Sequence, residues 1–193
     1  MNSVRMDNIS WVEYEQRVKA GSIVFPPCGA TEQHGPHLPL GTDALLASAI
    51  SEDVAREVAG IVASAISYGY KSQPRSGGGQ HFCGTTSVDG ATLSGTIRDA
   101  VREFHRHGVR RLVIVVGHFE NQWFVTEGDR TRDAGHRREQ RDGSHACRAL
   151  GVLSQGNARC NFPERVSWDC ARTCHRDRDV DDAPLSPATG VAR

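Results

Sequence analysis

The sequence predicts an α/β protein in which a mainly parallel sheet is flanked by helices, and three observations support this fold class. Short apolar runs that suit strands alternate with segments of helical periodicity over residues 1–128. The run Leu112–Val116 is continuously apolar, which is typical of a strand buried on both faces. Apolar side chains between Leu93 and Phe104 recur at the spacing of an amphipathic helix. Strands that alternate with helices in this way indicate a parallel sheet.

The other elements are predicted from local signals at their ends. Ser10 and Glu13 form a capping-box pattern, so a helix is expected to begin at residue 11. Glycines mark the expected helix ends, and the Pro26–Pro27 pair is expected to end a short strand. The expected elements are helix 11–20, strand 22–25, helix 43–58 closed by Gly60, strand 61–66, loop 69–90, a helix ending at Gly108, strand 112–116 and a helix from about Asn121.

Composition and charge exclude several classes of protein. The 193 residues include 38% hydrophobic and 24% charged residues, which suits one soluble domain. The 23 basic residues balance the 23 acidic ones, so a nucleic-acid partner held by bulk charge is not expected. No apolar run approaches the ~18 residues of a membrane span, and the N-terminus does not have the pattern of a secretion signal. We therefore expect a cytoplasmic protein with reduced cysteines and neither a nucleic-acid nor a membrane partner.

The composition changes near Gly128. Residues 129–193 contain twelve Arg and no Lys, and their Leu, Ile, Val and Phe together number eight. Such a low apolar content is typical of a segment that cannot form a core. No helix or strand period persists over ten residues there. We therefore expect residues 129–193 to be disordered.

Two polar clusters follow predicted strands, at the edge of a parallel sheet where functional groups gather. The first cluster contains Glu32 and His34 and is followed by Asp43, and the second contains His118 and Glu120. In an extended segment, residues two apart point to the same side, so each Glu–His pair can face one site. Carboxylate and imidazole ligands suit Zn²⁺ or Mn²⁺. The spacing predicts a site for two divalent ions.

Three runs of this sequence are similar to the creatininase (creatinine amidohydrolase) family in order and spacing. They are TEQHGPHLPLGTD, YGYKSQPRSGGGQHFCGTTSVDGATLSGTIRD and VVGHFENQWFVTEG. The resemblance covers roughly residues 9–128. It implies a three-layer creatininase-like fold whose C-terminal part is missing here, because relatives continue past the end of this chain. It also implies a homohexamer.

The resemblance implies a role for each matching residue. Five residues match metal ligands: Glu32 and His118 for a Mn²⁺ or Zn²⁺ ion, His34 and Glu120 for a Zn²⁺ ion, and Asp43 as the carboxylate that bridges them. Glu120 is also the expected catalytic residue. Ser76 matches a substrate-contacting serine, and Phe119 takes a place where creatininase often has tyrosine. The implied reaction is attack of a metal-bridging water on the lactam carbonyl of creatinine, which opens the ring to creatine.

Several alternatives remain open. The substrate can be another cyclic amide or a formamide, or the chain can be an inactive fragment that binds metal without turnover. A shift of the reading frame by one base near Glu127–Asp129 explains the Arg-rich sequence of residues 129–193. Codons in the shifted frame can encode motifs similar to those of the family. The rival interpretation is a zinc module, formed by Cys147, Cys160, Cys170, Cys174, His145 and His175.

Overall fold

The computed structural model describes residues 3–128 and 149–154. In chain order the named elements are η1 (Met6–Asn8), α1 (Trp11–Lys19), β1 (Val24–Phe25), β2 (Pro27–Cys28), α2 (Thr42–Val58), β3 (Ile61–Val62), η2 (Pro74–Ser76), α3 (Gly90–Arg106), β4 (Arg111–Val116), η3 (Phe119–Asn121) and β5 (Ala149–Ser154). Residues 122–128 are also helical. Among the described residues, no helix is long and apolar enough to cross a bilayer.

The sheet is parallel throughout its named pairs, as the alternation of strands and helices predicts. β1 pairs with β3 on one side and with β4 on the other. β2 continues along β4 after Pro26, whose carbonyl accepts a hydrogen bond from the amide of Val115 at 3.0 Å. The prolines were expected to end the strand. Instead pairing resumes at β2, because proline lacks an N–H donor but keeps its carbonyl acceptor.

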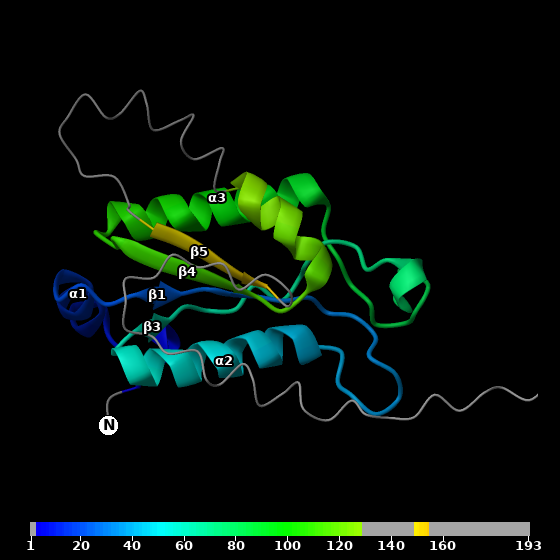
Figure 1. The fold of residues 1–193 in the computed structure, drawn as a ribbon, viewed down its shortest axis with the longest axis horizontal. Coiled ribbons are helices and arrows are strands. Elements are labelled where there is room, and N and C mark those ends of the chain that lie inside the picture. The colour runs from blue at the N-terminus through cyan, green and yellow to red at the C-terminus, as the bar shows by residue number, and fades with distance from the viewer. Residues whose placement is uncertain (1–2, 129–148, 155–193) are drawn as a thin grey trace, which may run out of the picture. The chain divides into compact units, whose positions relative to one another are not determined.

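A strand in the last third of the chain differs from the sequence-based expectation. β5 pairs with all six residues of β4, and Val115 and Val116 pair with both β5 and β2. β2 and β5 therefore lie on opposite edges of β4, and Figure 1 shows β5 beside β4. Residues 129–193 were expected to lack regular structure. A parallel strand of six residues is shorter than the ten-residue window in which a period was sought. The rest of that segment lies outside the described residues.

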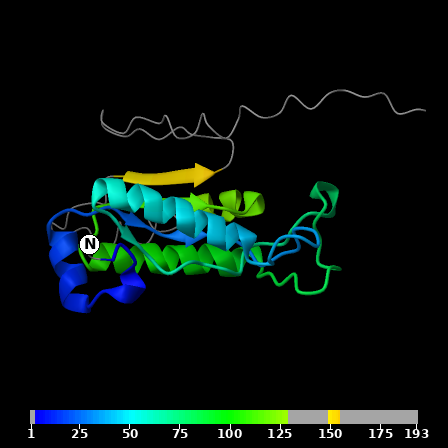
Figure 2. The same ribbon diagram turned by 90° about the horizontal axis from the view of Figure 1, so that it is seen from below.

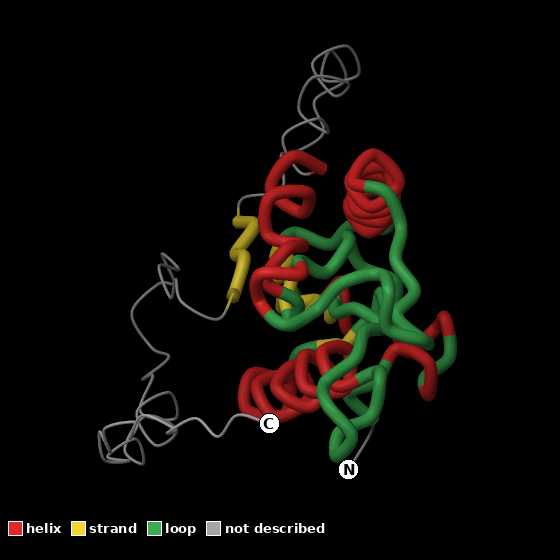
Figure 3. Tube along the Cα trace, turned by 90° about the vertical axis from the view of Figure 1, so that its right-hand side faces the viewer, coloured by secondary structure: helices red, strands yellow, loops and turns green. Residues whose placement is uncertain are grey.

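Helices cover both faces of the sheet, so the three-layer prediction is confirmed. Figure 1 shows α3 along one face and α2 along the other, and Figure 3 shows the same layers from the end. The buried stripe of α3, formed by Leu93, Ile97 and Val101, packs in one cluster with Leu112 and Ile114 of β4. Burial of these apolar side chains supplies the main stabilising free energy of the domain.

Two helix ends and one strand refine the sequence-based picture. Ser10 caps α1, since its hydroxyl accepts a hydrogen bond from the amide of Glu13 at 3.2 Å. α2 ends at Val58 as expected, but the residue that closes it is Ala59, in the left-handed conformation with φ of 52°, rather than Gly60. Strand 61–66 was predicted too long: β3 covers two residues, and Ile66 forms an isolated bridge.

Both long loops extend from the same end of the sheet (Figures 1 and 2). The loop after β2 and the loop after β3 are joined where Thr31 and Thr86 form an antiparallel bridge. The amide of Thr86 donates to the carbonyl of Thr31 at 2.9 Å. This end carries the carboxyl ends of the parallel strands, where functional groups are expected.

The first turn of α2 packs closely against two glycines at the ends of β2 and β4. A Cβ atom at Gly29 would overlap the amide nitrogen of Ala44, and one at Gly117 would overlap the carbonyl oxygen of Asp43. Ala47 follows one turn later and is 1% exposed. Small residues on both sides therefore let the helix backbone approach the sheet and fix the height of Asp43 above it.

We expect the Gly117→Ala variant to lose about 1–3 kcal/mol of unfolding free energy, because the new methyl group forces α2 away from the sheet. Urea denaturation measures this loss. Gly95→Ala is the matched control, since the nearest atom to a Cβ there is Nη2 of Arg98 at 3.7 Å. That helical substitution should gain up to about 1 kcal/mol. Equal stability of the two variants would contradict the close-packing argument.

Candidate metal centre

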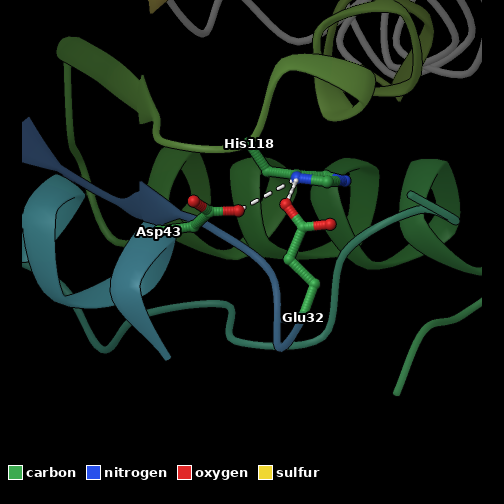
Figure 4. A group of neighbouring side chains, drawn as sticks. All are labelled: Glu32, Asp43 and His118. Carbon is green, nitrogen blue, oxygen red and sulfur yellow. Dashed lines mark hydrogen bonds and ion pairs between the residues drawn. The ribbon is translucent and has the colours of Figure 1, made fainter. Parts of the chain in front are cut away.

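Three side chains from separate parts of the chain meet at the carboxyl end of the sheet. Glu32 lies on the loop after β2, Asp43 is the second residue of α2, and His118 follows β4. One ligand atom of each lies within 4.8 Å of the others. Figure 4 shows both carboxylates directed at the imidazole. Parallel pairing of β2 with β4 brings these segments together although His118 is 75 residues from Asp43.

Asp43 lies between two imidazole rings. Its Oδ1 is 3.0 Å from Nε2 of His34, and its Oδ2 is 2.9 Å from Nδ1 of His118. The side chain is 8% exposed, so solvent competes little for either oxygen. One carboxylate thus presents one oxygen to each ring.

His118 is the most buried of these side chains, at 2% exposed. Its Nδ1 also lies 3.1 Å from Oε1 of Glu32. Its Nε2 lies 3.1 Å from the carbonyl oxygen of Tyr70 and 3.4 Å from Oε2 of Glu120. Both ring nitrogens therefore have acceptors, as a protonated imidazole requires.

The carboxylates create a strongly negative local potential. Burial by itself would lower the pKa of His118, but hydrogen bonds to Asp43 and Glu32 outweigh it and raise this pKa to about 10. Burial would likewise raise the pKa of Glu32, but hydrogen bonds from His118 and Ser72 hold it at about 2. Without a metal ion, a proton on His118 supplies positive charge at this position.

The donor set fits divalent cations. Carboxylate oxygens and imidazole nitrogens are ligands of Zn²⁺ and Mn²⁺, and all of those named here are at least three-quarters buried. Glu32, Asp43 and His118 form the compact group. His34 contacts it through Asp43, and Glu120 contacts it through His118. The structure thus gathers all five residues that the sequence pattern singled out.

The two expected substrate-contacting residues lie on segments near this group. Phe119 directly follows His118, begins η3 and is 63% exposed. Ser76 ends η2 on the loop after β3. The side chain of Ser76 lies outside what the structure describes. The role expected for each stays a prediction.

Sequence reasoning missed two polar side chains that support the group. Ser72 is 6% exposed and hydrogen-bonds Glu32. Asn121 is 0% exposed and hydrogen-bonds the backbone at Tyr70 and Gly29. Ser72 was one of many polar residues in a Gly- and Ser-rich loop, so no local pattern distinguished it. Asn121 is the last residue of the second polar cluster, but no supporting role was assigned to it because its partners are remote in sequence.

A family model described as creatininase, creatinine amidohydrolase, matches residues 7–179. The chain belongs to the creatininase family. The match runs past Gly128, where the motifs quoted above end, and it includes β5.

Curated relatives match part of the chain. A creatinine amidohydrolase of Pseudomonas putida is 52% identical over 127 residues, which cover 65% of this chain and 49% of that protein. A mycofactocin precursor peptide peptidase of Mycobacterium tuberculosis is 38% identical over 115 residues, covering 54% and 43%. The chain therefore spans about half the length of the curated relatives it matches.

Solved structures of creatininase resemble the fold. A crystal structure of creatinine amidohydrolase has a TM-score of 0.72 at 47% identity, covering 80% of this chain and 58% of that one. A mutant creatininase complexed with creatine has a TM-score of 0.74 at 43% identity, covering 79% and 58%. Two similar structures are described as a Zn-Zn type and as creatininase Mn.

In chelator-treated protein, we expect unfolding free energy to fall as the pH rises from about 6 to about 8.5. The folded pKa of His118, about 10, exceeds its ordinary value of 6.5. Its contribution is therefore complete below pH 6.5 and is lost as the pH rises through the folded value. Urea denaturation at both pH values measures the change.

Glu32→Gln is the control for this pH dependence, because it removes one carboxylate that raises the pKa of His118. The variant should show a shallower fall in stability over the same range. A stability that is flat or rises with pH in the parent protein would contradict the protonated His118.

Proposed function

We propose that this chain is a metal-dependent amidohydrolase that opens the lactam ring of creatinine to give creatine. The position of Asp43, with one oxygen toward His34 and the other toward His118, is the observation that carries the proposal. A carboxylate placed in this way suits a bridge between two ions. The 52% identity to a creatinine amidohydrolase supports creatinine as the substrate.

The ligands divide into two sets around Asp43. Glu32 and His118 would hold one ion, Zn²⁺ or Mn²⁺, and His34 and Glu120 would hold a Zn²⁺ ion. The 3.1 Å separation of Glu32 and His118 supports the first set. Two such cations lower the pKa of a nearby water and polarise the amide carbonyl. Turnover is expected to depend on Glu120 in particular.

The remaining residues of the site would bind the substrate. Ser76 and Phe119 belong to segments that border the metal ligands, and both are proposed to contact creatinine. The ring of Phe119 offers an apolar surface without the hydroxyl group of a tyrosine. A weaker polar contact with the substrate follows from that difference.

Two other functions compete with this one. A relative named as a peptidase favours hydrolysis of a different amide by the same metal centre. The chain spans 49% of the length of its creatinine amidohydrolase relative, which favours a fragment that binds metal without turnover. The shifted reading frame near Glu127–Asp129, the homohexamer and the cytoplasmic location stay predictions.

Incubation of the purified chain with creatinine tests the proposal, with creatine formation as the measurement. We expect activity to stop when EDTA removes the ions and to return with Zn²⁺ or Mn²⁺. Glu120→Gln should lower the rate at least about 100-fold, because loss of a metal ligand removes several kcal/mol of transition-state stabilisation. Glu57→Gln, on the exposed side of α2, is the matched control and should keep full activity.

The outcomes separate the three functions. Metal uptake without hydrolysis of any small amide would favour the fragment, and hydrolysis of another amide would favour the different specificity. Unchanged activity in Glu120→Gln would contradict the ligand assignment.

A further inference from the structure

One short segment after β3 touches three of the five proposed ligands. Within residues 70–73, the carbonyl of Tyr70 lies 3.1 Å from Nε2 of His118, and the hydroxyl of Ser72 hydrogen-bonds Glu32. The amide of Gln73 donates to Oε1 of Glu120 at 3.3 Å. This segment therefore contacts proposed ligands on two separate parts of the chain, the loop after β2 and the residues after β4.

The Tyr70 carbonyl determines which nitrogen of His118 can bind an ion. When Nε2–H donates to that carbonyl, the lone pair of Nδ1 faces the carboxylates of Glu32 and Asp43. Metal-binding histidines commonly donate their second N–H to a carbonyl, which fixes the ring orientation. His34 is oriented separately, since its Nδ1 lies 3.2 Å from the carbonyl of Glu32.

Asn121 holds the Tyr70 peptide in place. Its Oδ1 accepts from the amide of Tyr70 at 2.8 Å, and its Nδ2 donates to the carbonyl of Gly29 at 2.8 Å. The side chain is fully buried, so both bonds are shielded from water. A Cβ at Gly69 would lie 2.7 Å from Oδ1 of Asn121, so glycine is needed for this approach. The side-chain amide of Asn121 thus links the end of β2 to the segment that orients His118.

The hydroxyl of Ser72 makes two hydrogen bonds, one as donor and one as acceptor. The hydroxyl donates to the Glu32 carboxylate and accepts from the amide of Gly79 at 3.2 Å. A Cβ at Gly78 would overlap the Ser72 oxygen, so the loop closes on this serine through a residue without a side chain. With 6% exposure, Ser72 has little access to solvent as an alternative partner.

We propose that Ser72 and Asn121 are positioning residues for the ion held by Glu32, Asp43 and His118. Ser72 acts directly on Glu32, and Asn121 acts on His118 through the Tyr70 carbonyl. This inference rests on the proposed function, because it requires that Glu32 and His118 bind a metal ion. It assigns the orientation of Glu32 and His118, and with it the affinity for the ion, to residues that do not touch the ion themselves.

Titration of the full chain with Co²⁺ after chelator treatment tests the inference, with visible absorption as the readout. The parent should bind two ions. Ser72→Ala should weaken one of them about 10–100-fold and change its absorption bands, while the other keeps its affinity. Asn121→Ala should weaken the same ion. Ser87→Ala is the matched control, since this serine lies in the same loop and pairs with Gln80 at 3.1 Å.

Circular dichroism of the metal-free variants separates loss of metal affinity from loss of fold. A folded Ser72→Ala protein that titrates like the parent would overturn the positioning role. A parent that binds no Co²⁺ would overturn both this role and the proposed function. Two bound ions, weakened selectively by Ser72→Ala but without creatine formation, would support the positioning role while the substrate proposal fails.

Discussion

The site depends on the placement of one carboxylate, Asp43, between two imidazoles. The carboxylate is held there because the first turn of α2 lies directly against Gly29 and Gly117. Its two oxygens then face His34 and His118 at hydrogen-bond distance. The fold thus converts a packing constraint, the absence of two Cβ atoms, into the charge arrangement that suits a pair of cations.

Much of the fold follows from local sequence pattern. The periodicity of α3 and the apolar run of β4 are strong signals, because each reflects burial along a whole element. The weaker predictions failed where pairing with a neighbour overrides local propensity. β2 continues past Pro26 since β4 supplies its partners, and β5 forms along the other edge of β4 from six residues. The sequence around β2 or β5 does not show which strand each will pair with.

The candidate ligands were predictable for a different reason. Glu32 and His34 stand two residues apart on the loop after β2, and His118 and Glu120 stand two residues apart just after β4. A parallel sheet brings such segments together. The supporting residues were not predictable in this way. Asn121 and Tyr70 are 51 residues apart, and their hydrogen bond depends on the path of a loop that has no periodic signal. Their role emerges from three-dimensional contacts.

Diffraction from crystals soaked with Mn²⁺ or Zn²⁺, recorded at the absorption edge of each metal, tests whether Asp43 bridges two ions. We expect two anomalous peaks about 3.5–4 Å apart, the spacing of two-metal sites, with Asp43 between them. One peak, or two peaks that do not share Asp43, would contradict the bridging role of this carboxylate.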